Sequence, residues 1–204
     1  MKLKKGLLIV LEGIDGSGKT TQARSLLRRL RAAGVRAVRF REPSRGKWGR
    51  EIKRRARRAG SLTPEEELEL FLRDRRENVE RNLRPALARK AVVVLDRYYF
   101  SSVAYQGAKG LEPERIRRRN ERFAVRPDLV VILDVRPGIG LARISGRETR
   151  DELFEREHYL ARVRAIFRSF RGPRFVHLDG SRDKRALSRE IWGLVEPLLR
   201  RSSR

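Results

Sequence analysis

The residues best suited to chemistry lie near the start of the chain, where glycines surround a lysine and a threonine. Residues 13–20 read Gly-Ile-Asp-Gly-Ser-Gly-Lys-Thr and match G-x-x-x-x-G-K-[ST] at every fixed position. Glycines allow backbone N–H groups to curl around a phosphate, and the N-terminus of a following helix adds partial positive charge. In such loops the lysine, here Lys19, reaches the β- and γ-phosphates, and the hydroxyl of Thr20 reaches Mg²⁺. The pattern therefore predicts a nucleoside triphosphate site that uses Mg²⁺ as its cofactor.

Three further stretches combine arginine with acidic, aromatic or hydroxyl residues. They are 41–43 (Arg-Glu-Pro), 70–75 (Leu-Phe-Leu-Arg-Asp-Arg) and 96–107, which begins Asp-Arg-Tyr and ends Tyr-Gln-Gly. The first and third follow predicted strands, and ligands of an open parallel sheet bind outside the carboxyl ends of its strands. We therefore expect Arg41, Asp96 and Arg97 to converge with the phosphate loop on one edge. Because Asp96 ends a buried strand near that loop, it is predicted to serve the Mg²⁺ site.

The elements that must position these residues alternate between strand and helix. Short apolar runs predict strands at 7–11, 35–40, 91–95, 129–133 and 175–178. Longer segments predict helices at 20–33, 65–88, 113–123, 150–170 and 184–199, with Thr63 as the cap of the second. Continuous apolar runs are typical of strands covered on both faces, as in a parallel sheet. The chain is therefore predicted to be an α/β protein, with one domain of residues 1–204 around an open five-stranded sheet.

Composition removes several classes of protein and leaves a question about charge. Cysteine is absent, which excludes a disulfide scaffold, a cysteine-ligated metal and a thiol nucleophile. The apolar runs are too short for a signal peptide or a transmembrane helix, so we expect a cytoplasmic protein without a membrane partner. Lys and Arg number 51 against 26 Asp and Glu, and the net charge of +25 favours an anionic partner. Two basic runs, 53–58 and 115–122, lack interleaved aromatic residues and are interpreted as solvated helix faces, with nucleic-acid contact as the alternative.

Taken together, these stretches resemble the thymidylate kinase family. Its pattern is matched in order by residues 12–22, 41–43, 71–75, 96–107 and 127–135. The resemblance implies a three-layer P-loop kinase fold, with a five-stranded parallel sheet, helices on both faces and a short lid at residues 143–155. It also implies transfer of the γ-phosphoryl group of ATP to dTMP with Mg²⁺, giving dTDP and ADP, in an enzyme that is usually a homodimer. A kinase for another deoxynucleotide or nucleoside, and a nucleic-acid-associated P-loop ATPase or binding module, are the alternatives.

On the donor side, the resemblance implies that the loop binds ATP and that Arg143 lies against the adenine. The ATP-binding set is Gly13, Asp15, Gly16, Ser17, Gly18, Lys19, Thr20, Thr21 and Arg143. The metal would be held through Thr20 and Asp96, with Glu155 near a metal-bound water. The loop carries Ser17 at its variable position and no arginine, so the lid would supply the catalytic cation. The catalytic set is Lys19, Arg97 and Asp15, with Arg147 or Arg150 from the lid.

For the acceptor base, the resemblance implies that Phe71 stacks on thymine and that Arg75 hydrogen-bonds its carbonyl edge. Ser102 and Gln106 would line the base pocket. A planar base favours an aromatic face, which agrees with this assignment. Because Phe71 lies between two leucines on a predicted helix, core packing is its alternative role.

For the rest of the acceptor, the resemblance implies that Tyr105 lies against the deoxyribose and disfavours a 2′-hydroxyl. Asp15 would hold the 3′-hydroxyl or a metal-bound water, and Arg41 and Arg97 would grip the phosphate. Forked guanidinium groups suit a phosphate dianion. Ordinary helix packing is the alternative role for Tyr105.

Two departures from the family pattern bear on selectivity. The Arg-Glu-Pro stretch usually continues with a Gly-Gly-Thr run, but residues 44–49 here read Ser-Arg-Gly-Lys-Trp-Gly. Lys47 and Trp48 are expected either to reshape the mouth of the acceptor site or to serve only in packing. Leu72 and Arg73 also replace smaller residues, so both changes bear on the strictness of dTMP selection more than on the reaction type.

Overall fold

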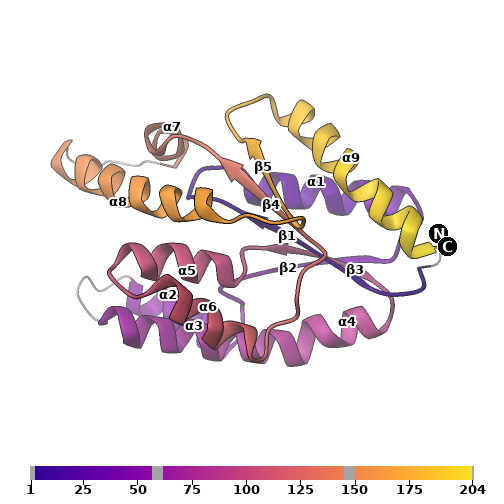
Figure 1. Ribbon diagram of the computed structural model, residues 1–204, viewed down its shortest axis with the longest axis horizontal. Helices are drawn as coiled ribbons and strands as arrows, with labels where there is room; N and C mark the ends of the chain where they lie inside the picture. Colours follow the sequence, from indigo (N-terminus) through magenta and orange to yellow (C-terminus); the bar gives the residue numbers. More distant parts are fainter. Residues whose placement is uncertain (1–2, 57–61, 145–149, 204) are drawn as a thin grey trace.

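The computed structural model describes residues 3–56, 62–144 and 150–203, without the side chains of 150–154, and is built on a parallel sheet (Figure 1). Its strands are β1 (Leu7–Glu12), β2 (Ala37–Arg41), β3 (Val92–Asp96), β4 (Leu129–Asp134) and β5 (Phe175–Asp179). All neighbours pair in parallel, in the order β2-β3-β1-β4-β5. The five strands predicted from apolar runs, and their parallel arrangement, are confirmed.

Helices cover both faces of this sheet. One face packs against α1 (Lys19–Ala32) and α9 (Lys184–Ser203). The other face packs against α3 (Pro64–Asn78), α5 (Tyr99–Ala108) and α8 (Arg150–Ser169). The shorter helices are α2 (Lys47–Ala56), α4 (Arg84–Ala88), α6 (Pro113–Glu121) and α7 (Pro137–Ala142). This three-layer arrangement confirms the fold that the resemblance implies.

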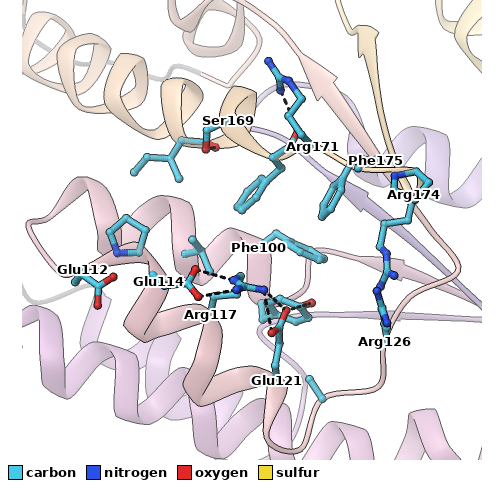
Figure 2. Close-up of a pocket in the computed structure, with 18 residues that line it drawn as sticks. Phe100, Glu112, Glu114, Arg117, Glu121, Arg126, Ser169, Arg171, Arg174 and Phe175 are labelled. Atoms are coloured by element: carbon cyan, nitrogen blue, oxygen red, sulfur yellow. Dashed lines mark hydrogen bonds and ion pairs between the residues drawn. The ribbon is translucent and has the colours of Figure 1, made fainter.

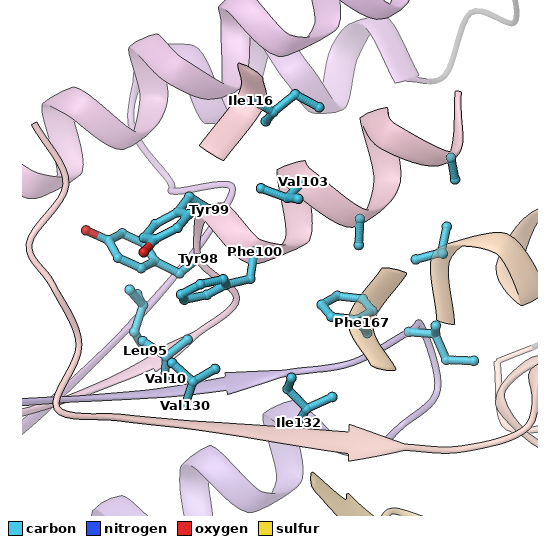
Figure 3. Close-up of a cluster of buried hydrophobic side chains, with 14 of the residues drawn as sticks. Val10, Leu95, Tyr98, Tyr99, Phe100, Val103, Ile116, Val130, Ile132 and Phe167 are labelled. Carbon is cyan, nitrogen blue, oxygen red and sulfur yellow. The ribbon is translucent and has the colours of Figure 1, made fainter. Parts of the chain in front are cut away.

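Strand β1 explains why the apolar runs are continuous. Leu7 and Ile9 belong to the core beneath α1 and α9, whereas Leu8 and Val10 belong to the core on the opposite face. Figure 3 shows this second core, in which Val10 lies below the aromatic ring of Phe100 from α5. Since both faces of the strand are buried, the alternation of polar and apolar residues disappears.

The helix predicted at 65–88 is present and carries a local change of pitch. It consists of α3, a π-helical segment at Val79–Leu83 and α4. Thr63 caps it as predicted, because its hydroxyl accepts from the N–H of Glu66 while the Glu66 carboxylate accepts from the N–H of Thr63 at 2.8 Å. This reciprocal capping box satisfies two backbone donors that the helix itself leaves unpaired.

Three helices, α2, α5 and α7, lie outside the predicted helix ranges. The sequence of α5, Tyr-Phe-Ser-Ser-Val-Ala-Tyr-Gln-Gly-Ala, contains seven buried residues and no charge. A helix enclosed on most sides has no polar face, so it lacks the 3.6-residue periodicity on which the prediction depends. In the described part of the chain, no helix has the length and apolar character that crossing a membrane requires.

Candidate active site

The phosphate loop leaves β1 and enters α1 in the way its sequence predicts. Gly16 and Gly18 have φ values of 75° and 94°, in the left-handed region that favours glycine. A side chain at Gly16 would also overlap the backbone of Gly140 at α7. The loop is therefore a tight backbone turn, held against α7, with the N-terminus of α1 at its end.

Lys19 is the buried cation of this loop. Its ammonium donates to the carbonyl oxygen of Ile14 at 2.6 Å and to the hydroxyl of Ser17 at 3.1 Å, and the residue is 5 % exposed. Burial, together with the nearby charge of Arg97, lowers the pKa of Lys19 to about 7. A polyanion entering the loop would favour the charged form of the lysine.

Thr20 and Asp96 meet beside the loop, although 75 residues separate them in the chain. The hydroxyl of Thr20 donates to Oδ2 of Asp96 at 2.7 Å. The Oδ1 atom of Asp96 is buried and has no hydrogen-bond partner among the described residues. Buried polar atoms are nearly always paired, so an unpaired carboxylate oxygen beside a threonine hydroxyl fits a divalent cation that prefers oxygen ligands.

Arg97 follows β3 directly and has a φ of 71°, a rare conformation for a side chain of its size. Its guanidinium donates to Asp15 at 2.6 Å, to the hydroxyl of Ser101 at 2.9 Å and to the hydroxyl of Tyr105 at 3.3 Å. Tyr105 in turn donates to Asp15 at 3.0 Å. Burial opposes ionisation of Asp15, but Arg97 and Lys19 outweigh it, and the pKa of this carboxyl is lowered. A backbone held in this unusual conformation aims Arg97 at the phosphate loop.

Glu12 stabilises the turn after β3 that carries Arg97, a role that was not predicted from the sequence. Its buried carboxylate accepts from the N–H of Tyr98 at 2.7 Å and from the hydroxyl of Ser101 at 2.6 Å. Burial raises the pKa of Glu12 despite the nearby Arg97. An acidic residue at the end of an apolar strand is the signal that could have revealed it, since charged residues are rarely buried without partners.

Two cavities meet at this edge of the sheet. The first, of about 480 Å³, runs along the phosphate loop and includes Thr21, Arg143 and Gly180. The second, of about 340 Å³, is lined by the predicted acceptor residues. Residues lining both cavities are Asp15, Arg41 and Arg97. The structure therefore brings the expected donor and acceptor sides together at two arginines and a carboxylate.

In the first cavity, Arg143 spans the phosphate loop and the turn after β5. Its guanidinium donates to the carbonyl oxygens of Gly16 at 3.2 Å and Gly180 at 3.0 Å. Arg182 and Lys184 line the same cavity and were not predicted from the sequence. These cations extend the positive lining of the cavity beyond the loop.

In the second cavity, Phe71 is partly buried and contributes to the wall. Gln106 is buried; its amide group donates to Glu67 at 3.1 Å, and its Oε1 has no partner among the described residues. Tyr105 contributes to the wall, and Tyr159 of α8 joins it, donating to the carbonyl oxygen of Tyr105 at 2.9 Å. An aromatic ring and an unpaired acceptor in one cavity suit a planar ligand that carries a hydrogen-bond donor.

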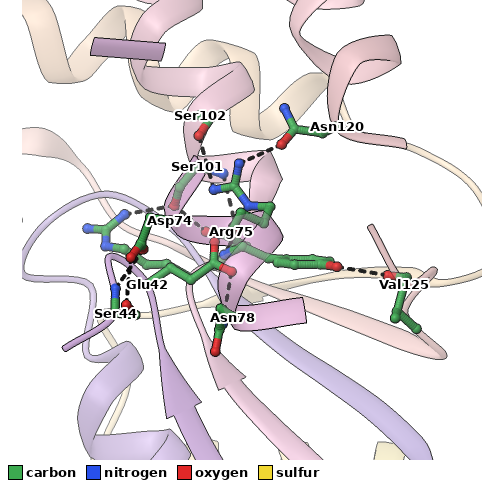
Figure 4. Close-up of polar contacts among 12 residues, drawn as sticks. Glu42, Ser44, Asp74, Arg75, Asn78, Ser101, Ser102, Asn120 and Val125 are labelled. Atoms are coloured by element: carbon green, nitrogen blue, oxygen red, sulfur yellow. Dashed lines mark hydrogen bonds and ion pairs between the residues drawn. The ribbon is translucent and has the colours of Figure 1, made fainter. Parts of the chain in front are cut away.

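Arg75 lies at the back of this cavity within a buried polar network (Figure 4). Its guanidinium donates to Glu42 at 2.7 Å, to Asn120 at 2.5 Å and to Ser102 at 3.1 Å. Asn78 also donates to Glu42 at 3.1 Å, and burial raises the pKa of Glu42 to about 7 despite the ion pair with Arg75. Glu42 and Asn120 lie far from Arg75 in the sequence, so their contacts with its guanidinium were not predictable from the pattern.

Some predicted residues lie elsewhere or outside the described part of the chain. Arg147 falls among the residues that the structure does not describe, and for Arg150 only the backbone, at the start of α8, is described. Glu155 is exposed on α8 and lines neither cavity. Trp48 lies on α2, outside the acceptor cavity, with the guanidinium of Arg73 5.0 Å from its ring centre. Of its two expected roles, the structure therefore favours packing.

Two cavities that meet at arginines suit a protein that passes a phosphoryl group from one bound molecule to another. The phosphate loop after β1, the Thr20–Asp96 pair beside it and the strand order define the class: this is a P-loop kinase.

Comparisons with known proteins identify the family. A profile of the family described as Thymidylate kinase matches residues 11–191. The thymidylate kinase of Xanthomonas campestris pv. campestris strain B100 is 47 % identical over 190 residues, covering 93 % of this chain and 83 % of the relative. The thymidylate kinase of Akkermansia muciniphila is 46 % identical over 188 residues, covering 92 % and 90 %. The chain belongs to the thymidylate kinase family, whose reaction is the ATP-dependent phosphorylation of dTMP to dTDP. The family therefore favours a dTMP kinase over the alternative of a nucleic-acid-associated P-loop ATPase.

Proposed function

We propose that the chain acts as a single domain in which dTMP and ATP occupy the two cavities and meet at Arg97, Arg41 and Asp15, yielding dTDP for dTTP synthesis. The observation that carries this proposal is the lining that the two cavities share. An oxygen of the dTMP phosphate attacks the γ-phosphorus of ATP, the bond to the β,γ-bridging oxygen breaks, and ADP leaves. Such a transfer depends on positioning and charge, so it requires no nucleophilic side chain from the protein.

On the donor side, the backbone of the phosphate loop would bind the β- and γ-phosphates of ATP. Lys19, now bonded to Ile14 and Ser17, would turn to the phosphates, which would favour its charged form. Arg143 is fixed between Gly16 and Gly180, where its side chain would border the adenine. The lid would contribute a further cation from Arg147 or Arg150, since the loop carries no arginine of its own.

We propose that Mg²⁺ accompanies ATP, bound through the hydroxyl of Thr20 and the carboxylate of Asp96. The unpaired and buried Oδ1 of Asp96 supports this assignment. Mg²⁺ would neutralise phosphate charge as the γ-phosphoryl group is transferred. Glu155 would reach this site only through a metal-bound water, as the resemblance implies.

On the acceptor side, Phe71 would stack on the thymine ring, and Arg75 would donate to its carbonyl edge. Arg75 has five N–H donors, and three of its nitrogens already make the contacts with Glu42, Asn120 and Ser102. Two donors therefore remain for the base. The free Oε1 of Gln106 would accept from the N3–H group of thymine.

The sugar and the phosphate of dTMP would lie toward Asp15, Arg41 and Arg97, the residues that line both cavities. Tyr105 is fixed by Asp15 and Arg97, so it leaves little room for a 2′-hydroxyl. Asp15 is half-exposed, which would allow it to accept from the 3′-hydroxyl. Arg97 and the exposed Arg41 would bind the acceptor phosphate from two directions.

A panel of acceptors tests the proposal in a coupled assay of ADP release. We expect dTMP to give the highest kcat/KM, dUMP and dCMP to give lower values, and thymidine to give almost none. Thymidine lacks the phosphate that Arg41 and Arg97 would bind. Equal turnover of dTMP and thymidine would contradict the assignment of the two arginines.

Two further expectations rest on the family resemblance. We propose that the enzyme works as a homodimer in the cytoplasm, where ATP and dTMP are available. Sedimentation equilibrium over a range of protein concentrations measures the assembly directly. A mass of one chain at concentrations at which the enzyme is active would contradict the dimer.

A further inference from the structure

A third cavity, of about 840 Å³, lies away from the two substrate cavities (Figure 2). It is lined by residues of α5, α6, the end of α8 and the turn that leads into β5. It shares no lining residue with either substrate cavity. Its volume lies within the range of roughly 300–1,000 Å³ that is usual for small-molecule sites.

Aromatic rings form one wall of this cavity. Phe170 and Phe175 are stacked, with ring centres 5.7 Å apart and planes 12° apart. Phe100 meets both rings edge-on, at 5.3 Å and 5.2 Å. Phe100 is buried, whereas Phe170 and Phe175 are partly exposed in the cavity. Such a wall suits a planar aromatic ligand, because aromatic pairs prefer stacked or edge-to-face contacts.

Two arginines line another side of the cavity. Figure 2 shows the side chains of Arg126 and Arg174 pointing toward one another. Neither guanidinium forms a hydrogen bond or an ion pair with any residue in the described part of the chain. Like charges facing one another repel, and an anion between them would remove the repulsion and gain charge-assisted hydrogen bonds.

The acidic residues of the cavity are engaged elsewhere, so they do not neutralise this pair. Arg117 binds Glu114 at 2.6 Å and Glu121 at 3.1 Å. Glu112 caps α6 by accepting from the N–H of Arg115 at 3.0 Å. Arg171 also lines the cavity, but its guanidinium donates to the carbonyl oxygens of Arg168 and Phe170. Among the described residues, the guanidinium groups of Arg126 and Arg174 are therefore the ones left to bind an anion in the cavity.

We propose that this cavity binds a phosphorylated planar aromatic compound of the nucleotide class. The aromatic ring would lie against Phe170 and Phe175, and the phosphate would bind between Arg126 and Arg174. An occupant would also touch α5, the helix whose residues Ser102, Tyr105 and Gln106 line the acceptor cavity. The proposal does not depend on the roles assigned to the substrate cavities.

Calorimetric titration of the full chain with 1-naphthyl phosphate tests this inference, since the compound carries a planar ring and a phosphate but no sugar. In Lys19→Met with Arg97→Ala, which removes two phosphate-binding cations from the substrate cavities, we expect one binding site per chain. 1-Naphthol and inorganic phosphate, each carrying one half of the probe, should bind at least about tenfold more weakly.

Two pairs of variants locate the site. Arg126→Glu with Arg174→Glu should weaken binding of the probe at least about tenfold, because it reverses both charges. Arg24→Glu with Arg28→Glu makes the same change of net charge on exposed residues of α1 and should leave binding unchanged. If the first pair fails to fold, as judged by thermal unfolding, Arg126→Gln with Arg174→Gln replaces it. Absence of binding, loss of binding in Lys19→Met with Arg97→Ala, or equal affinities of the two charge-reversed pairs would overturn the proposal.

Discussion

The guanidinium of Arg97 forms a 2.6 Å ion pair with the carboxylate of Asp15, which ties the end of β3 to the phosphate loop. Arg97 is almost buried, whereas Asp15 is half-exposed. Both side chains line both substrate cavities. The pair therefore holds a cation at the boundary of the two cavities before any substrate binds.

Arg97→Ala should lower kcat/KM for dTMP by about a hundredfold or more, since a phosphate charge loses a preorganised donor. Arg97→Lys should recover only part of the activity, because an ammonium group cannot form the forked contact. Steady-state kinetics with dTMP as the varied substrate measures both effects. Arg36→Ala, an exposed arginine before β2, is the control, and wild-type kinetics in Arg97→Ala would contradict the assignment.

Asp96→Asn should raise the Mg²⁺ concentration needed for half-maximal activity at least about tenfold, since the neutral amide is a poorer ligand for a hard cation. Its size and its capacity to accept from Thr20 are retained. Titrating Mg²⁺ at fixed ATP and dTMP measures the change. Asp128→Asn, which removes an ion pair with Lys5, should keep the wild-type dependence. An unaltered dependence in Asp96→Asn would place the metal elsewhere.

Binding of ATP should be coupled to uptake of protons by Lys19. The pKa of the free lysine is lowered to about 7, so most of it is neutral at pH 8, and the phosphates of ATP would raise this pKa. At pH 8 we expect uptake of up to about one proton per site, falling as the pH is lowered below 7. Calorimetry of ATP binding in buffers of different ionisation enthalpy measures the number of protons taken up per site. Lys19→Met should abolish the uptake, and a variant that still takes up a proton would assign it to another group.

Asn120 should act as a positioning residue for Arg75. Its Oδ1 accepts from Arg75, and its amide group donates to the carbonyl oxygen of Ile116 at 2.8 Å, which fixes its orientation. Asn120→Ala should raise KM for dTMP about three- to tenfold with little change in kcat, and should reduce the preference for dTMP over dCMP. Cytosine carries an amino group where thymine carries the carbonyl that Arg75 would recognise.

The matched control for Asn120 is Asn82→Ala, which removes a partly buried amide that bonds Asn78 outside the acceptor cavity. Equal losses of stability in the two variants, with a change in KM only in Asn120→Ala, would separate positioning from folding. Unchanged selectivity between dTMP and dCMP in Asn120→Ala would show that Arg75 needs no support from α6.

The lid should supply a cation to the transition state. Arg147→Ala or Arg150→Ala should lower kcat at least about tenfold with little change in KM, because an arginine finger acts mainly on the transferring group. Arg143→Ala should mainly raise KM for ATP, since Arg143 borders the donor cavity. Arg118→Ala is the control, because that side chain is exposed and pairs with Glu112. If the lid variants match this control, the catalytic cation comes from another element.

The sequence alone predicted the strands, the parallel sheet and the phosphate loop, because these depend on local patterns. An apolar run such as 7–11 is recognisable from its own residues, and Lys19 and Thr20 are adjacent members of one motif. The roles of Phe71 and Arg97 came from the resemblance to a family. In both cases the information lay within a few consecutive residues.

The tertiary structure decided how distant residues support one another. Glu12 holds the turn after β3, and Asn120 of α6 fixes Arg75 of α3, although neither belongs to a local pattern that predicts its partner. Helix α5 escaped prediction because burial on most sides removed its polar face. Motifs describe neighbours along the chain, whereas buried hydrogen bonds and ion pairs form between neighbours in space, and only packing of the helices on the sheet determines which residues those are.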